Sequence, residues 1–109
     1  MSYSVKTISK FDKSLKKLIK KFPSLKEEFI ILVKNLKENP EQGTPLGKNC
    51  YKIRLAIKSK GKGKSGGARI ITNIVVSDTI VYLLSIYNKS EKQDLSDKEL
   101  EEILKSLPD

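Results

Sequence analysis

The chain has 109 residues, with 22 Lys or Arg against 13 Asp or Glu, a formal net charge of +9 and no histidine. This length predicts a single domain over residues 1–109 that can bury a core without metal or disulfide support. The lack of histidine excludes a paired-histidine ribonuclease, a histidine-based triad and a histidine-containing metal site. One cysteine excludes an intrachain disulfide, and no apolar run has the length of a signal peptide or a membrane span. We therefore expect a cytoplasmic protein without membrane contact.

The positive charge is concentrated in the first part of the chain. Residues 91–109 contain seven acidic and three basic side chains, whereas residues 1–90 contain six acidic and nineteen basic ones. Such an excess of cations indicates a polyanionic partner, most often nucleic acid. A membrane surface is a weaker alternative because no aromatic-rich amphipathic helix accompanies the charge. Solubility alone would also explain a basic surface.

One strand and two helices are predicted in the first half of the chain. Residues 3–8 alternate in the manner of a strand, and Pro23 separates the two helices. Each helix has an apolar stripe at helical spacing and begins at a capping-box pattern, a serine followed three residues later by an acid. The two pairs are Ser9 with Asp12 and Ser24 with Glu27. The short connection predicts an αα-hairpin whose lysines are mainly solvated, with direct substrate contact as the less favoured alternative.

Three strands follow a segment that is predicted to be irregular. Residues 39–49 contain two prolines and two glycines, which are typical of a loop. Residues 51–57 alternate as a strand, and residues 68–76 and 79–87 are rich in β-branched side chains. Because only residues 77–78 separate the last two strands, a tight antiparallel hairpin is predicted. One face of this meander would be apolar and the other would carry cations exposed to water.

A short helix is predicted to end the domain. Residues 97–107 have an apolar stripe, Ser96 and Glu99 form a capping-box pattern, and Leu95 and Leu100 have the spacing of a hydrophobic staple. The predicted fold is therefore α+β, with element order β-α-α-β-β-β-α. It has a mainly antiparallel four-stranded sheet, an N-terminal helical hairpin on one face and this short C-terminal helix.

The glycine- and lysine-rich segment 58–67 lies between two predicted strands. It contains Gly63-Lys64-Ser65, but a phosphate-binding loop needs a glycine where Lys58 stands, and a helix where a strand follows. A basic hairpin loop that follows an RNA backbone is the better interpretation. A merely solvated hairpin tip is the alternative. The candidate RNA-binding residues of this loop are Lys58, Lys60, Lys62 and Lys64.

Three cations of the strands are the candidate catalytic groups. Lys52 and Arg54 share one strand face, and Arg69 begins the neighbouring strand. Two or three cations on one sheet face could hold a phosphodiester and stabilise the additional charge of a pentavalent transition state. An ordinary exposed face is the alternative interpretation.

Further candidates lie at and after the end of the last strand. Tyr87 could stack on a base or assist proton transfer, although an aromatic side chain here could also pack on the final helix. Lys89 and Lys92 are candidate RNA-binding residues. Cys50 is most simply a small buried residue, since no histidine could activate its thiol.

The order of these elements and four short motifs resemble the RelE/ParE superfamily of bacterial toxins, and most closely its HigB-like members. The motifs are Pro-Leu-Gly, Cys-Tyr-Lys-Ile-Arg, Gly-Gly-Ala-Arg and Leu-Leu-Ser-Ile-Tyr-Asn-Lys-Ser-Glu. The resemblance covers nearly the whole chain and implies the toxin of a type II toxin–antitoxin pair. RelE-like members cut mRNA in the ribosomal A site, whereas ParE-like members inhibit DNA gyrase.

The resemblance also suggests roles for individual residues. Lys52 and Arg54 match the basic pair of the RelE-like second strand, and Arg69 matches the arginine that contacts the scissile phosphate. Lys89 stands where RelE-like enzymes carry a further arginine. Leu95 stands where they carry a tyrosine that aids proton transfer, so the general base remains open. The nearby candidates for that base are Tyr87, Glu91 and Lys92.

The resemblance and the sheet cations together predict a ribosome-dependent mRNA endoribonuclease that needs no metal or organic cofactor. Its catalytic residues would be Lys52, Arg54, Arg69 and Tyr87. Its expected partners are a cognate antitoxin protein, the ribosomal A site and mRNA. The alternatives are a ParE-like gyrase inhibitor without chemistry of its own and a relative that binds RNA without cutting it.

Overall fold

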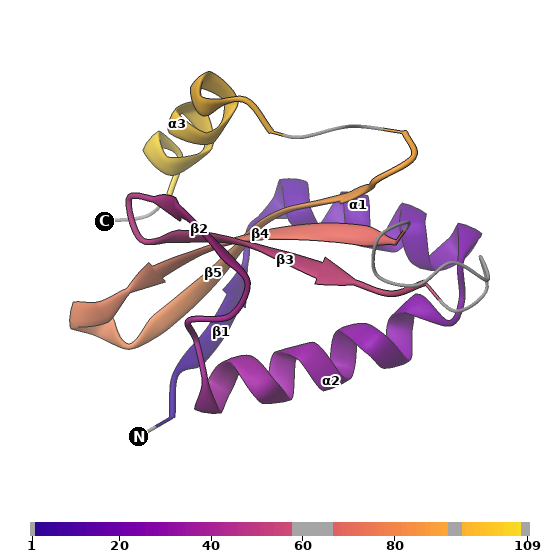
Figure 1. Cartoon of the computed structure of the whole chain (residues 1–109), viewed down its shortest axis with the longest axis horizontal. Coiled ribbons are helices and arrows are strands. Elements are labelled where there is room, and N and C mark those ends of the chain that lie inside the picture. Colours follow the sequence, from indigo (N-terminus) through magenta and orange to yellow (C-terminus); the bar gives the residue numbers. More distant parts are fainter. Residues whose placement is uncertain (1, 58–66, 92–94, 108–109) are drawn as a thin grey trace.

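The computed structural model describes residues 2–57, 67–91 and 95–107 and has an α+β fold built on one sheet (Figure 1). The sheet has five strands in the order β1-β5-β4-β3-β2. The elements along the chain are β1 (Ser4–Thr7), α1 (Ser9–Lys21), α2 (Leu25–Glu38), β2 (Thr44–Gly47), β3 (Cys50–Leu55), β4 (Ala68–Val75), β5 (Ile80–Asn88) and α3 (Asp97–Lys105).

The sheet is larger and less regular than the predicted four-stranded antiparallel one. β3, β4 and β5 form the expected antiparallel meander. β1, however, pairs parallel with β5, so the sheet is mixed. The fifth strand, β2, lies inside the segment predicted to be a loop and pairs with the start of β3. Its Pro45 hid it from sequence reasoning, yet proline is tolerated here because β2 is an edge strand and does not need every amide donor.

The ends of the helices test the three predicted capping boxes. Ile8 rather than Ser9 precedes α1 in extended conformation, so Ser9 lies inside the helix and forms no cap. Ser24 precedes α2 but has helical dihedral angles instead of the extended ones that a cap requires, and its side chain does not cap the helix. Both of these predictions were wrong. The third is confirmed, since Ser96 and Glu99 exchange two bonds of 3.1 Å at the start of α3.

The connection between β4 and β5 is longer than the predicted two-residue turn. Residues 76–78 form a 3₁₀ turn, and Thr79 then adopts a left-handed conformation with φ 51°. Ser and Asp do not favour the positive φ angles that a two-residue hairpin demands, so a four-residue connection forms instead.

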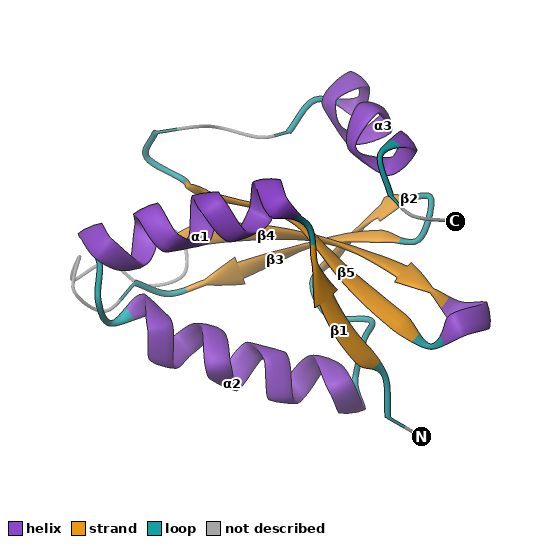
Figure 2. Cartoon of the chain, turned by 180° about the vertical axis from the view of Figure 1, so that it is seen from behind, coloured by secondary structure: helices purple, strands orange, loops and turns teal. Residues whose placement is uncertain are grey.

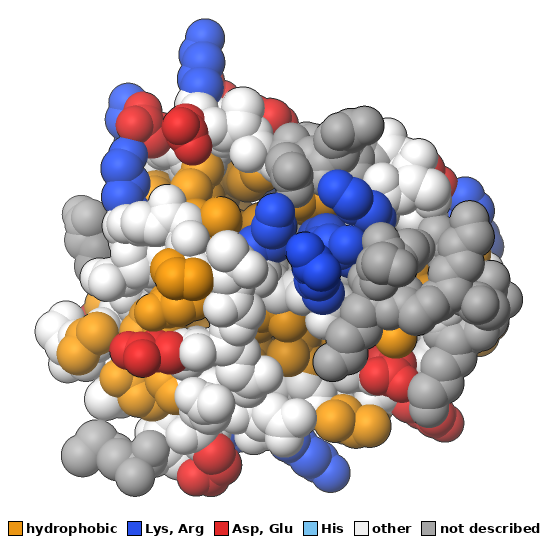
Figure 3. Space-filling view, viewed as in Figure 1, with side chains coloured by type: hydrophobic (Ala, Val, Ile, Leu, Met, Phe, Trp, Pro, Cys, Tyr) orange, Lys and Arg blue, Asp and Glu red, His pale blue; other side chains and the backbone are white. Residues whose placement is uncertain are grey.

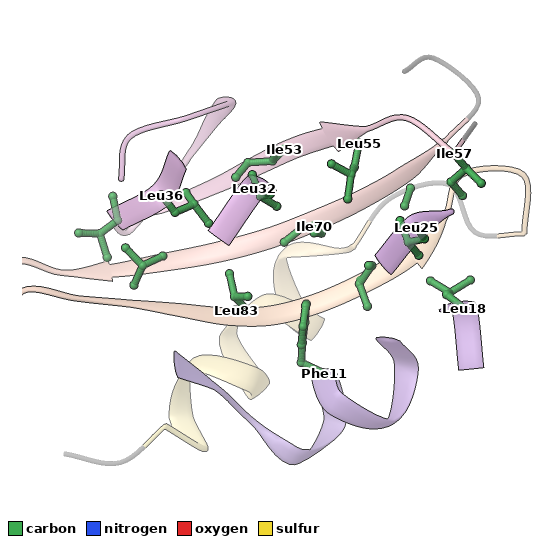
Figure 4. Close-up of a cluster of buried hydrophobic side chains, with 14 residues drawn as sticks. Phe11, Leu18, Leu25, Leu32, Leu36, Ile53, Leu55, Ile57, Ile70 and Leu83 are labelled. Carbon is green, nitrogen blue, oxygen red and sulfur yellow. The ribbon is translucent and has the colours of Figure 1, made fainter. Parts of the chain in front are cut away.

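One face of the sheet carries the main core, beneath α1 and α2. Their apolar stripes pack on side chains of β3, β4 and β5, among them Ile53, Ile70 and Leu83 (Figure 4). The rings of Phe11 and Phe29, one from each helix, lie 5.8 Å apart. The predicted apolar face is thus confirmed, and both N-terminal helices cover it.

The other face is not simply exposed to water, as the sequence had suggested. At one end it is covered by α3, which packs a second apolar cluster against the sheet. That cluster contains Cys50, Ile71, Tyr82, Leu84, Tyr87, Leu100 and Ile103. The candidate cations Arg54 and Arg69 lie on this face outside the cluster that α3 covers. None of the helices within the described parts of the chain is both long enough and apolar enough to cross a membrane.

Candidate functional site

Three of the predicted catalytic residues form one row across the sheet. Arg54 of β3 is directly paired with Arg69 of β4, which is directly paired with Tyr87 of β5. Directly paired residues project to the same face of a sheet with their Cβ atoms about 5 Å apart. Residues some 33 positions apart in the chain are thus brought side by side, and we call Arg54, Arg69 and Tyr87 the sheet row.

Arg69 is far less accessible than the sequence suggested. Only 3% of it is exposed, whereas Arg54 is exposed, so the expectation that both arginines face solvent was wrong for Arg69. Its Nη1 donates a hydrogen bond of 3.1 Å to the carbonyl oxygen of Ala68. Burial matters because a guanidinium stays charged under all ordinary conditions. A buried cation acts through a lower dielectric and attracts an approaching anion more strongly than an exposed one would.

Tyr87 is also mostly buried, with 7% exposed, and it belongs to the cluster under α3. It thus shares an apolar cluster with Leu100 and Ile103 of the final helix, in line with the alternative interpretation. Its position beside Arg69 nevertheless fixes it at the boundary between the apolar and cationic parts of the face. Its ring can therefore support the neighbouring guanidinium from the side of the apolar cluster.

The sheet row combines two like charges at facing positions. Like charges directly opposite each other destabilise a pair of strands, whereas an opposite charge at either position would stabilise it. Local conflicts of this kind are expected where a site binds a ligand that relieves them, and an anion between the guanidinium groups would do so.

Lys52 extends the cationic part of the face along β3. It lies two residues before Arg54, on the same side of the strand, and is half-buried. Gly43 packs against its backbone: with φ +91°, an added Cβ at Gly43 would collide with the Lys52 carbonyl oxygen. This contact requires glycine and fixes the strand at Lys52. Figure 3 shows Lys and Arg side chains gathered over this part of the sheet.

A groove of about 430 Å³ runs between β3 and α2. Its β3 side includes Lys52 and Arg54, and its α2 side includes Glu28 and Ile31, which is 53% exposed. Among the described residues, β2 pairs with β3 only as far as Lys52. The groove therefore follows an edge of β3 whose backbone has no neighbouring strand in the described part of the chain.

A second hollow, of about 340 Å³, lies between α1 and the end of β5. Lys17 of α1 lines it together with Tyr87, Asn88 and Glu91. Glu91 accepts a hydrogen bond of 2.7 Å from Lys21 Nζ at the end of α1, and Asn88 Nδ2 approaches the same oxygen at 3.5 Å. Glu91 was already a candidate from its position after β5. Lys17 and Asn88 were missed, because no local pattern links α1 to a segment some 70 positions away.

The remaining predicted residues have different outcomes. Lys89 is half-buried in the turn after β5, where its backbone amide donates to the Gly67 carbonyl oxygen at 3.0 Å. Cys50 is buried as predicted, with 1% exposed, and desolvation by burial raises the pKa of its thiol. Five predicted RNA-binding residues lie outside the described residues. They are Lys58, Lys60, Lys62, Lys64 and Lys92.

An exposed ion pair links α3 to the sheet. Lys48, in the turn between β2 and β3, pairs with Glu101 of α3 at 2.7 Å. The hydrogen bond and the charge of Lys48 lower the pKa of the Glu101 carboxyl below its ordinary value. Leu95, which precedes α3, packs against the cluster beneath that helix.

Comparisons with known proteins agree with this architecture. The family model described as the RelE toxin of the RelE/RelB toxin–antitoxin system matches residues 6–107. A mutant of the E. coli toxin RelE in the free state is similar, with a TM-score of 0.62 and 19% identity over 99% of this chain and 100% of that chain. The toxin–antitoxin complex RelBE2 from Mycobacterium tuberculosis gives 0.61 and 19% identity over 81% of this chain and 99% of that one. The same E. coli mutant in complex with an antitoxin RelBc peptide has a TM-score of 0.54 and 17% identity, over 99% of this chain and 100% of that chain. At these identities the likeness to solved structures concerns the fold.

Proposed function

The chain belongs to the RelE toxin family of toxin–antitoxin systems, and from this premise we propose that it is a ribosome-dependent mRNA endoribonuclease that inhibits translation. The observation that carries the proposal is the sheet row, in which two arginines face each other across paired strands beside Tyr87. Lys52 adds a third cation on the same side of β3. A phosphodiester that acquires a second negative charge in its transition state is the kind of ligand that such a group of cations stabilises.

In the proposed reaction, the 2′-hydroxyl of one nucleotide attacks the phosphorus that follows it. The bond from the 2′-oxygen to phosphorus forms and the bond from phosphorus to the 5′-oxygen breaks. The products are a 2′,3′-cyclic phosphate and a 5′-hydroxyl end. The 2′-hydroxyl proton passes to a general base, and the leaving 5′-oxygen takes up a proton. Every atom is supplied by the RNA itself, so the protein needs only to orient groups, stabilise charge and transfer protons.

The residues of the site divide these tasks by their chemistry. Arg54 and Arg69 stabilise the phosphorane, because arginine binds phosphate with two parallel hydrogen bonds but cannot give up its proton. Lys52 binds the strand or takes part in proton transfer. Tyr87 supports Arg69 and orients the cleaved nucleotide. Glu91, whose side chain is 56% exposed, lies near this end of the row and joins Tyr87 and Lys92 as a candidate for the base.

RNA binding would extend beyond the sheet row. Lys89 follows the row along the chain, in a turn whose backbone is anchored to Gly67, two residues before Arg69. The segment 58–66 contains four lysines and connects β3 to β4, the two strands that carry the arginines. A basic connection at this position is suited to follow an RNA backbone on either side of the scissile phosphate.

The deciding experiment compares ribosome-bound mRNA with naked mRNA. Purified protein should cut the ribosome-bound message and leave 2′,3′-cyclic phosphate ends. A message with a single 2′-deoxynucleotide at the cleavage site should resist cleavage there, since the nucleophile is missing. Equal cleavage of naked and ribosome-bound mRNA would contradict the ribosome requirement, and cleavage at the deoxy position would contradict the chemistry.

Inhibition of DNA gyrase is the rival function. A gyrase inhibitor would need no cations facing each other across two strands, so the sheet row favours the nuclease. Induced expression separates the two, because a nuclease stops protein synthesis first, whereas a gyrase inhibitor causes DNA damage and filamentation. Inhibition of supercoiling by the purified protein, together with intact mRNA, would support the rival.

A cognate antitoxin is the second partner that we propose, and the similar structures include toxin–antitoxin complexes. An acidic antitoxin segment could lie against the sheet or replace α3. The groove beside β3 suits the first mode, because it offers two cations, an exposed isoleucine and an unpaired strand edge within the described chain. Hydrogen exchange on the complex tests both modes. Protection of β3 or a change at α3 is expected, whereas protection confined to α1 and α2 would exclude them.

A further inference from the structure

The helix α2 carries a second stripe of side chains, on the side that faces away from the core. Its buried leucines, such as Leu32, form the stripe that packs on the sheet. Four further residues have the spacing i, i+3, i+4 and i+7, which places them together along another side of the helix. They are Glu27, Ile30, Ile31 and Lys34. All four are exposed, and we call them the outer stripe.

The centre of the outer stripe is apolar. Ile30 is 45% exposed and Ile31 is 53% exposed. The other exposed large apolar side chains of the described residues, Leu46 and Val76, belong to β2 and to the turn after β4. Isoleucine is also not among the best helix formers, so these two positions of α2 gain nothing from propensity. Adjacent exposed isoleucines with charged residues around them are typical of an interaction surface.

Opposite charges flank these isoleucines. Glu27 lies one helical turn before them and Lys34 one turn after them. Seven positions separate the two charges, about 10 Å along the axis, so they are too far apart to pair within the helix. Neither takes part in an ion pair with another residue of the described chain. The stripe therefore has an acidic end, an apolar centre and a basic end.

A second copy of the chain fits this pattern when its α2 runs antiparallel. A two-fold axis between Ile30 and Ile31 would place Glu27 of each chain against Lys34 of the other, with the isoleucines of both chains between the two ion pairs. A parallel arrangement would instead place Glu27 against Glu27 and Lys34 against Lys34. An interface that uses one surface twice must complement itself, and the outer stripe does so in the antiparallel arrangement alone.

The position of α2 also suits contact between two positively charged chains. The net charge of +9 opposes association of two copies. In α2, however, three lysines are balanced by three glutamates. The sheet row lies on the other face of the sheet from this helix. Figures 1 and 2 show α2 at the border of the fold, with none of the other described helices or strands on its outer side. Contact through α2 therefore joins surfaces of balanced charge.

We propose that the outer stripe is a self-association surface, through which two copies of this chain pair antiparallel along α2. The 14 residues of the helix span about 21 Å. A contact along one helix buries less than the roughly 1,200 Å² that a stable interface needs, so the dimer is reversible and depends on concentration. Ile31 also lines the groove beside β3, so a second copy competes with any antitoxin segment that uses this residue.

Sedimentation velocity of the purified chain over a series of concentrations tests the proposal. About 0.15 M salt screens the repulsion between the net charges beyond roughly 8 Å. Glu27→Lys and Lys34→Glu should each weaken dimerisation by about 2–30-fold, because each removes two exposed ion pairs at once. One substitution raises the net charge and the other lowers it, so a loss in both does not come from net charge.

The double variant E27K/K34E is the decisive one, because it reverses both ion pairs and keeps the net charge. It should dimerise like the unaltered chain. The control Glu41→Lys, at an exposed position beyond α2, changes the net charge as Glu27→Lys does and should have a smaller effect. The variant I30Q/I31Q should abolish dimerisation. Since both isoleucines are exposed, its urea unfolding should stay close to that of the unaltered chain.

Four outcomes would overturn the proposal. A chain that stays monomeric at every concentration would exclude the dimer. Association that survives I30Q/I31Q would assign it to another surface, and a double charge variant that fails to recover would exclude the antiparallel register. Variants that dimerise normally but bind the antitoxin more weakly would assign the outer stripe to the antitoxin. None of these measurements involves RNA, so they are independent of the proposed ribonuclease activity.

Discussion

The two ends of one sheet face are formed by the same strands but differ in the side chains that they carry: one end is apolar and the other is cationic. Under α3, β3 to β5 present Cys50, Ile71 and Leu84, all of which are almost fully buried and packed on apolar partners. A few residues along the same strands, they present Arg54 and Arg69 at facing positions. The apolar end follows every rule of packing, whereas the cationic end violates the rule against facing like charges.

This difference separates residues that stabilise the fold from residues that the fold tolerates. Removing an apolar side chain should lower stability and leave the chemistry of the folded protein intact. Removing a cation should impair the chemistry and leave the stability of the fold largely unchanged. Proteins commonly lose some stability at their functional sites in this way. The following substitutions test whether the residues under α3 mainly stabilise the fold and the residues of the sheet row mainly serve the proposed activity.

Arg54→Ala should have the largest effect on activity. Loss of one donor to the transition state typically slows a reaction by 10²–10³-fold, or about 3–4 kcal/mol. Urea unfolding should show unchanged or slightly higher stability, because the repulsion from Arg69 is removed. Lys34→Ala on α2 is the control for the loss of one exposed cation. Full cleavage of ribosome-bound mRNA by the Arg54 variant would place the site elsewhere. Arg69→Ala is less decisive, since truncating a buried side chain also disturbs packing.

Leu84→Ala should have the largest effect on stability. Its side chain is fully buried beneath α3, and a leucine truncated in a core costs about 2–5 kcal/mol. Cleavage per folded molecule should stay within a few-fold of the original at a temperature where the variant is folded. Loss of activity in the fully folded variant would show that the apolar end also takes part in the chemistry.

Thr72→Val should be mildly stabilising. Thr72 Oγ1 is buried and, in the described part of the chain, has no hydrogen-bond partner. Valine has nearly the same shape, so the change removes an unsatisfied hydroxyl at little cost in packing. We expect a gain of about 1 kcal/mol in the free energy of unfolding. Thr7→Val, at an exposed strand position, is the control. A destabilised Thr72 variant would indicate that the hydroxyl has a partner.

Glu101→Gln should have the smallest effect, and that effect should depend on pH. The pKa of Glu101 is lowered in the folded protein by the hydrogen bond and charge of Lys48. The ion pair therefore contributes above the ordinary carboxyl pKa of about 4.3, and the contribution is lost as pH falls through the lower folded value. The midpoints of urea unfolding for the two proteins should differ slightly at pH 7, and the difference should shrink as the pH falls below the ordinary carboxyl range. Because the pair is exposed, high salt should reduce the difference. A difference that stays constant as the pH falls through the acidic range would contradict this account.

The sequence predicted what depends on local patterns. Period-two alternation identified β3, and helical spacing identified the stripes of α1 and α2. The capping-box prediction was correct only at Ser96, which has the extended backbone conformation that an N-cap residue needs. Ser9 and Ser24 belong to the same sequence pattern but have helical backbone conformations, which the sequence pattern does not reveal.

What the sequence missed depends on contacts between distant segments. The parallel pairing of β1 with β5 and the strand at Pro45 follow from which edges the completed sheet leaves open. Lys52, Arg54, Arg69 and Tyr87 were all named from the sequence, but the direct pairing of the last three was not. The burial of Arg69 was missed for the same reason, since alternation indicates a face and does not reveal what covers it.

The parallel pairing of β1 with β5 also has a consequence for the order of events during synthesis. Ser4 pairs with Ile80 and Thr7 with Leu83, so β1 cannot join the sheet until β5 has been synthesised. Contacts between such distant segments slow folding, because a long loop must be ordered before they form. β5 also carries Tyr87, so the sheet row is complete only when this last strand has left the ribosome. A nascent chain therefore holds its arginines on unfinished strands, and the proposed site is not assembled while β5 is still being translated.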